Sequence, residues 1–176
     1  MTPQKRKSIR NHVQKLLEEN EVISAPVPVE RIAKSLDAQM RFSPLDDELS
    51  GMVYVKDGTP IIGVNALHHP NRQRFTIAHE CGHLVLHRAE ITKEIHVDKG
   101  FPTMLMRDSV SAKGVNEMEV EANLFAAEIL MPASFLAQSL EDKPFDIDDE
   151  GAVTALAKEY KVSASAMRLR LGNLFA

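Results

Sequence analysis

Residues 79 to 83 are His-Glu-Cys-Gly-His, a pattern that can bind a metal ion on one face of a helix. Side chains four residues apart lie one above the other, so the imidazoles of His79 and His83 can reach the same ion. Zinc accepts neutral imidazole nitrogens in tetrahedral sites, and a catalytic zinc leaves one position for water. Glu80 lies about 100° around the helix from His79 and can reach that water without binding the metal. The pattern predicts hydrolytic chemistry, with His79 and His83 as ligands and Glu80 as the catalytic base.

A third protein ligand is needed, and the next long helix offers glutamates for it. At 100° per residue, Glu119 lies on one side of this helix with Asn123 one turn further on. A carboxylate on that side is costly to bury without a metal or a charge partner, and Asn123 could hydrogen-bond a ligating histidine. We therefore choose Glu119 as the third ligand; the alternative is an intrahelical or surface ion pair. The remaining glutamates cluster within about 40° and predict a solvated face: Glu117, Glu121 and Glu128.

Two other residues of the first motif need separate interpretations. Cys81 projects away from the two histidines, which indicates a small core residue rather than a ligand. It is the only cysteine in the sequence, which excludes an internal disulfide and a cysteine-cluster zinc site and favours a reducing compartment. His87 continues the histidine stripe, and we favour a polar residue at the helix end or a wall of the site over a metal ligand.

Length and composition bound the remaining possibilities. The 176 residues, of which 44% are hydrophobic and 26% charged, fit one globular domain spanning 1–176. We find no apolar run of the roughly 20 residues that a membrane span needs, so we expect a cytoplasmic protein with no membrane partner. A net charge of −4 argues against a protein that coats nucleic acid, while leaving room for a local basic patch.

The elements that must position these residues follow from periodicity and turn signals. The predicted order is helices, then a block of strands, then helices, and Asp57-Gly58 indicates a tight hairpin turn. The stretch 88–116 has no clean period, which is typical of a lid, a substrate-binding loop or a mobile segment. The sequence thus predicts an α+β fold with a small antiparallel sheet packed on several helices. The predicted helices are 3–19, 29–36, 71–87, 117–130, 133–140, 152–160 and 164–174, and the predicted strands are 39–42, 52–56 and 61–64.

These motifs together resemble the ImmA/IrrE family of zinc metallopeptidases. The resemblance rests on Arg72–Leu84 and Glu119–Pro132, and extends to Val27–Ala33, Gly63–Asn65 and Leu156–Ser163. It implies a zincin-like, gluzincin-type peptidase of the cytoplasm that binds one zinc ion per chain. Cys81 departs from the aliphatic residue usual at its position, and 88–116 is variable in the family.

The family resemblance also implies roles for individual residues and a class of partner. His79, His83 and Glu119 would be the ligands, and Glu80 the base that takes a proton from water and returns it to the leaving nitrogen. Members of the family are associated with mobile elements, stress responses and toxin–antitoxin loci. Those that are characterised cleave a helix-turn-helix repressor, so the expected function is repressor cleavage that controls transcription. Substrate-binding residues are not assigned, although an extended substrate could pair with a sheet edge near Met52–Lys56; alternatively, this hairpin only covers the core.

The competing hypothesis is a DNA-binding regulator, or a toxin–antitoxin component without peptidase activity. Residues 150–176 resemble a helix-turn-helix, and Arg168 and Arg170 on its second helix could contact phosphates or bases. Alternatively, the two helices pack on the catalytic core and the arginines are surface charges. The acidic net charge favours this second arrangement, so direct nucleic-acid binding is the lesser expectation.

Overall fold

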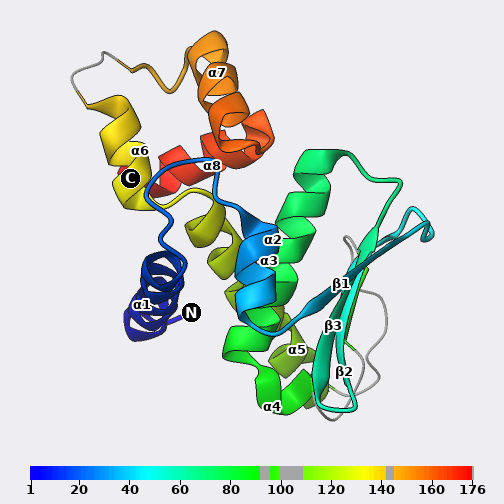
Figure 1. Ribbon diagram of the computed structural model, residues 1–176. Coiled ribbons are helices and arrows are strands. Elements are labelled where there is room, and N and C mark those ends of the chain that lie inside the picture. Colours follow the sequence, from blue (N-terminus) through cyan, green and yellow to red (C-terminus); the bar gives the residue numbers. More distant parts are fainter. Residues whose placement is uncertain (92–95, 100–108, 142–144, 176) are drawn as a thin grey trace.

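The computed structural model describes residues 1–91, 96–99, 109–141 and 145–175, and α3 lies at its centre (Figure 1). One side of α3 packs on strands β2 and β3, α2 packs beside it, and α5 lies against another side. The described helices are α1 (Pro3–Glu19), α2 (Val29–Ser35), α3 (Pro70–Leu86), α4 (Arg88–Ile91), α5 (Ser109–Leu130), α6 (Ala133–Leu140), α7 (Glu150–Tyr160) and α8 (Ala164–Phe175). The described strands are β1 (Gln39–Ser43), β2 (Leu49–Lys56), β3 (Thr59–Asn65) and β4 (His96–Lys99).

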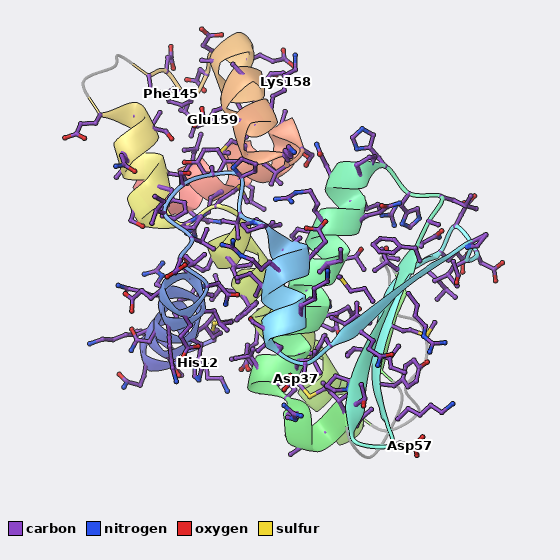
Figure 2. The ribbon with its side chains drawn as sticks, viewed as in Figure 1. His12, Asp37, Asp57, Phe145, Lys158 and Glu159 are labelled. Carbon is purple, nitrogen blue, oxygen red and sulfur yellow. The ribbon has the colours of Figure 1, made fainter. Side chains whose placement is uncertain are left out.

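The α+β class is confirmed, and the predicted helices and strands outside 88–116 are present. The hairpin between β2 and β3 turns at Asp57 and Gly58, whose φ angles of 50° and 80° match the two left-handed positions of a tight hairpin turn. Figure 2 shows Asp57 at the tip of this hairpin. Helix α1 buries the face that its periodicity indicated: Ile9, Val13, Leu16 and Leu17.

The sheet is mixed rather than antiparallel throughout. Its strand order is β1-β3-β2-β4, and β1 pairs with β3 in parallel, with Met40 opposite Ile62. The chain leaves β1 and enters β2 in the opposite direction, but β3 then inserts between them. Because β3 is antiparallel to β2, it must run parallel to β1.

The position of β4 also corrects the expected substrate edge. Strand β4 pairs with β2 from Leu49 to Val53, so Met52 and Val53 have strand neighbours on both sides. The hypothesis of an exposed edge at Met52–Lys56 is therefore wrong for this part of β2. The outer strands of the described sheet are β1 and β4.

The stretch 88–116 contains more regular structure than its sequence indicates. It holds α4, β4 and the first turns of α5, which begins at Ser109 instead of Glu117. The two short elements are four residues each, too short to show a period, and Gly114 weakens the helical signal of α5. Residues 92–95 and 100–108 lie outside the described residues, so the lid, substrate-binding loop or mobile segment expected within 88–116 stays a prediction for them.

One stretch of the described chain, Glu117–Leu140, is long and apolar enough by composition to cross a membrane. Half of an apolar 18-residue window within this stretch is buried in the fold, and the stretch is interrupted between α5 and α6. Buried helices of a folded core pass the same test, so the stretch is weak evidence for a membrane span. Four buried residues of α5 belong to the main hydrophobic core: Phe125, Ala126, Ile129 and Leu130.

Candidate metal centre

Side chains at the end of β3 and at the start of α3 bind the two loops that lie there. Asn65, the last residue of β3, is fully buried, and its amide nitrogen donates to the carbonyl oxygens of Leu45, Asp46 and Leu49 in the connection between β1 and β2. Gln73, in the first turn of α3, donates to carbonyl oxygens of the loop that leads out of β3, including that of His68 at 2.9 Å. Pro70 occupies the first turn, where its missing N–H costs nothing. These contacts set the position of α3 against the sheet.

The structure brings His79, His83 and Glu119 together between α3 and α5. The Nε2 atoms of the histidines lie 3.1 Å apart, and the Glu119 carboxylate oxygens lie 3.2 Å from His79 Nε2 and 3.3 Å from His83 Nε2. These are the spacings between corners of a tetrahedron whose centre lies about 2.0 Å from each corner, the usual length of a zinc–nitrogen or zinc–oxygen bond. The two histidines are buried and Glu119 is partly exposed. The group could therefore hold a metal ion.

His79 is held by Asn123, one turn beyond Glu119 on α5. Its Nδ1 lies 3.1 Å from Oδ1 of the Asn123 side chain, an amide oxygen that can only accept a hydrogen bond. His79 must then donate from Nδ1, which leaves the Nε2 lone pair directed at the other ligands. Such a partner fixes the tautomer and ring orientation of a ligating histidine. This contact is the one that sequence periodicity led us to expect.

His87 lies at the end of α3 and contacts the Nδ1 side of His83, not the Nε2 side that faces His79 and Glu119. Its Nδ1 lies 3.1 Å from His83 Nδ1, and its Nε2 lies 3.0 Å from Glu121 Oε2. His87 is 5% exposed, so its ring is part of the wall of the site. Of the two interpretations of its ring, ligand or wall, the geometry supports the second.

Glu80 is fully buried on the side of α3 that faces the sheet. Its Oε1 lies 3.6 Å from the position that a Cβ on Gly51 of β2 would take. Any side chain at Gly51 would also overlap Thr76 and the carbonyl oxygen of Gly63. Glycine at this position lets β2 approach α3 closely at the turn that carries the glutamate.

Cys81 is 1% exposed and packs in the core, as expected from its place on the helix. Desolvation by burial, reinforced by the nearby Glu80 carboxylate, raises the pKa of its thiol. It therefore remains a protonated thiol at neutral pH, which is unsuited to metal binding.

The prediction of a solvated face on α5 is correct only for Glu117, which is exposed. Glu121 is bound by His87 and by Lys5 Nζ at 3.1 Å, and Glu128 is 4% exposed. Periodicity failed here because α5 packs against both α3 and α1. The partners come from distant parts of the chain, and a single helix wheel carries no signal for them.

Glu128 joins three helices through two arginines. Arg170 of α8 donates from Nη1 and Nη2 to the two carboxylate oxygens, at 3.0 and 2.5 Å. Arg10 of α1 donates to Oε1 at 2.8 Å. Burial alone would raise the pKa of this carboxyl, but the hydrogen bonds and charges of both arginines hold it below its usual range. The network ties α1 and α8 to α5.

Arg170 therefore cannot serve the helix-turn-helix role considered from the sequence. It is 4% exposed, and its Nε also donates to the carbonyl oxygen of Met131 at 3.0 Å. The α7–α8 pair packs on the rest of the domain, while Arg168 remains exposed on its surface. The description of both arginines as surface charges is thus wrong for Arg170.

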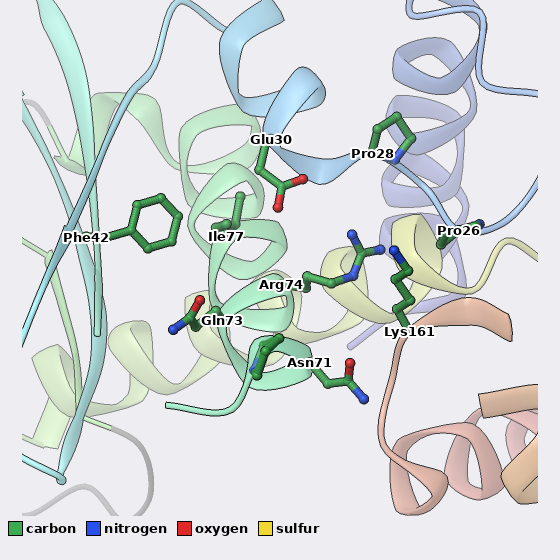
Figure 3. Close-up of a pocket in the computed structure, with 10 residues that line it drawn as sticks. Pro26, Pro28, Glu30, Phe42, Asn71, Gln73, Arg74, Ile77 and Lys161 are labelled. Atoms are coloured by element: carbon green, nitrogen blue, oxygen red, sulfur yellow. The ribbon is translucent and has the colours of Figure 1, made fainter. Parts of the chain in front are cut away.

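A separate cavity of about 460 Å³ lies at the first turns of α3, away from the histidines. In Figure 3, Arg74 of α3 and Lys161 from the α7–α8 junction extend into the same space, and Glu30 of α2 lies near Arg74. Arg74 also donates to the carbonyl oxygen of Val27 at 2.8 Å, which anchors the chain ahead of α2. None of the lining residues belongs to the candidate metal centre.

Comparison with known proteins identifies the family. The sequence profile of peptidase family M78, the IrrE N-terminal-like domain, matches residues 33–172. The chain belongs to this family. The motif helix α3 and the part of α5 that carries Glu119 both lie within the matched residues.

Two matches, one in sequence and one in structure, illustrate the extent of the likeness. Radiation response metalloprotease IrrE from Deinococcus radiodurans is 34% identical over 109 residues, which cover 60% of this chain and 29% of that protein. A solved structure of a Mycobacterium tuberculosis transcriptional regulator superposes with a TM-score of 0.61 at 14% identity, over 94% of this chain and 55% of that one. The second match shows a shared fold. The chain thus spans less than a third of the curated relative and about half of the solved one.

Proposed function

We propose that this domain is a zinc-dependent endopeptidase of the cytoplasm that cleaves a DNA-binding repressor. The observation that carries the proposal is the His79, His83 and Glu119 group, with a buried Glu80 one residue from the first histidine. Membership of the IrrE N-terminal-like family and the likeness to a metalloprotease support the enzyme class. The repressor as substrate rests on the family resemblance alone.

The chain's own residues divide the work of peptide hydrolysis. One zinc ion, held by His79, His83 and Glu119, would supply a Lewis acid that acidifies water and polarises the scissile carbonyl. Glu80 accepts a proton from the attacking water at its carboxylate and returns it to the leaving amide nitrogen. Asn123 keeps His79 in the tautomer that presents Nε2 to the metal.

The test combines metal analysis with cleavage of the repressor encoded nearest to this protein. Wild type and Glu80→Gln are purified, their zinc content is measured, and each is mixed with the repressor. We expect about one zinc per chain in both proteins. Only the wild type should cut the repressor into fragments and so free the operator DNA. The glutamine side chain of the variant keeps the shape of glutamate but cannot accept a proton.

Other outcomes identify the competing functions. Equal cleavage by both proteins would contradict Glu80 as the base. An intact repressor, together with operator-specific DNA binding by this chain that is lost in Arg168→Ala, would favour a DNA-binding regulator. A zinc-loaded protein that neither cuts the repressor nor binds DNA would favour a component without peptidase activity.

A further inference from the structure

A continuous chain of contacts leads from the candidate metal centre to the N-terminal helix. His83 Nδ1 lies 3.1 Å from His87 Nδ1, His87 Nε2 lies 3.0 Å from Glu121 Oε2, and the same Glu121 oxygen lies 3.1 Å from Lys5 Nζ. The side chains of His83 and His87 are 0% and 6% exposed, that of Glu121 is 13% exposed, and that of Lys5 is half exposed. The chain of contacts thus starts at the surface of α1 and ends inside the site.

The direction of each hydrogen bond follows from the carboxylate at Glu121. An ionised carboxylate only accepts, so His87 donates to it from Nε2. A neutral His87 then has a lone pair at Nδ1, which accepts the Nδ1 proton of His83. The Nε2 lone pair of His83 is left to face His79 and Glu119, which lie beside that atom. Lys5 completes the sequence, because its Nζ lies 3.1 Å from the same Glu121 oxygen and helps to hold that carboxylate in place.

We propose that Lys5, Glu121 and His87 are positioning residues of the metal centre, which set the tautomer and orientation of His83 and strengthen its bond to the metal. The proposal rests on the proposed zinc site but not on peptidase activity. It also makes α1 part of that site. Helix α1 ends at Glu19, before the first residue matched by the family profile, so the comparison assigns it no role.

Two features argue that the chain of contacts does more than pack α1 onto α5. First, α1 already has an independent anchor on α5, the ion pair between Arg10 and Glu128. Second, the contact of His83 Nδ1 with His87 corresponds to the contact of His79 Nδ1 with Asn123, at the same distance of 3.1 Å. Each ligating histidine therefore has its own orienting group, one provided directly by α5 and one through His87.

The decisive measurement is zinc affinity, obtained by competition with a chromophoric chelator. His87→Leu removes the Nδ1 acceptor and fills the space with an apolar side chain. It should weaken zinc binding by about 10- to 100-fold. His87→Asn restores an acceptor oxygen near the Nδ1 position, and should bind more tightly than His87→Leu. Glu121→Gln should lower the zinc affinity about tenfold. Lys5 acts only through Glu121 and lies at the surface, so Lys5→Met should lower the zinc affinity by at most about fivefold.

Arg10→Met is the matched control, because it removes a different ion pair between α1 and α5, the one with Glu128. We expect it to lower the thermal unfolding temperature while leaving zinc affinity unchanged. If His87→Leu folds poorly, the exposed Lys5→Met and the isosteric Glu121→Gln still carry the test. Wild-type zinc affinity in both Lys5→Met and Glu121→Gln, or an equal loss of affinity in Arg10→Met, would overturn the proposal.

Long-range proton–nitrogen NMR spectra of histidine-labelled, zinc-loaded protein test the tautomers directly. The expected result is a proton on Nδ1 of His83 and on Nε2 of His87, and the opposite tautomer of His87 would contradict the proposal. Failure of the proposed function is separable from failure of this inference. A wild type that binds zinc but cuts nothing leaves the inference intact and removes the peptidase, while a wild type that binds no zinc overturns both.

Discussion

Gly82 of α3 lies directly against Ala122 of α5, because a Cβ on Gly82 would come within 3.1 Å of the Ala122 Cα. The same Cβ would lie 3.2 Å from two atoms of Phe125. These distances are tighter than nine in ten Cβ contacts, so a side chain at position 82 would require α5 to shift by a few tenths of an ångström. The approach occurs between the two histidines in sequence, where it brings Glu119 of α5 to both of them.

We therefore expect Gly82→Ala to destabilise the protein and to weaken metal binding. Alanine favours a helix by about 1 kcal/mol over glycine, but forcing a methyl group into a packed interface costs about 1–3 kcal/mol. Thermal unfolding and zinc titration measure both effects. Gly172→Ala in α8 is the control, since a Cβ there meets nothing within 4 Å and the variant should be more stable than wild type. Unchanged zinc affinity in Gly82→Ala would show that the spacing of α3 and α5 is not critical.

The third-ligand assignment predicts a strong effect of Glu119→Ala on metal content. Its carboxylate is within 3.3 Å of both histidine nitrogens, and its loss leaves two ligands where zinc needs at least three from the protein. Zinc should be lost during dialysis, as measured by elemental analysis. Glu117→Ala, an exposed position on the same helix, should keep its zinc. If both variants retain one zinc per chain, another residue is the third ligand.

The Glu128 network predicts a pH-dependent loss of stability. Because the folded-state pKa of Glu128 is held below its unfolded value of about 4.3, its contribution is complete above that value and disappears as the pH falls through the folded pKa. Glu128→Gln should lower the free energy of unfolding by about 3–5 kcal/mol at pH 7, since Arg170 stays buried without a counter-charge. Urea unfolding of wild type and Glu128→Gln from pH 7 to pH 3 measures this effect. The difference between their free energies of unfolding should shrink below pH 4. A constant difference across this range would contradict the assignment.

Cys81 should resist thiol reagents in the folded protein. Its side chain is 1% exposed, and its raised pKa removes the reactive thiolate at neutral pH. Mass spectrometry after iodoacetamide treatment should find no modification in native buffer and complete modification in guanidinium chloride. Rapid alkylation of the native protein would indicate that α3 opens readily around the metal centre.

Local periodicity was sufficient for the groups that lie on the same face of one helix. The four-residue spacing of His79 and His83, and the four-residue spacing of Glu119 and Asn123, each place two side chains together, and the structure joins the two pairs. The α+β class and most helix bounds also follow from patterns within single segments.

Contacts between distant segments were not predictable in the same way. Glu121 was assigned to solvent because the wheel of α5 shows one polar face, yet Lys5 and His87 come from two other helices to meet it. The parallel pairing of β1 with β3 depends on which edge of the hairpin is open, and the residues of β1 do not encode that choice. The polar partners of α5 arise in this way from tertiary packing.

Placing the ligands on two separate helices links the folding equilibrium to the metal content of the surroundings. Because α3 and α5 present their ligands together only in the native fold, an ion that binds there favours the native state over the unfolded chain. By mass action, free zinc at 100 times its dissociation constant would add about 2.7 kcal/mol to the apparent stability. At the proposed zinc site, a fall in free zinc would therefore lower the apparent stability of the native fold, and with it the lifetime of the protein.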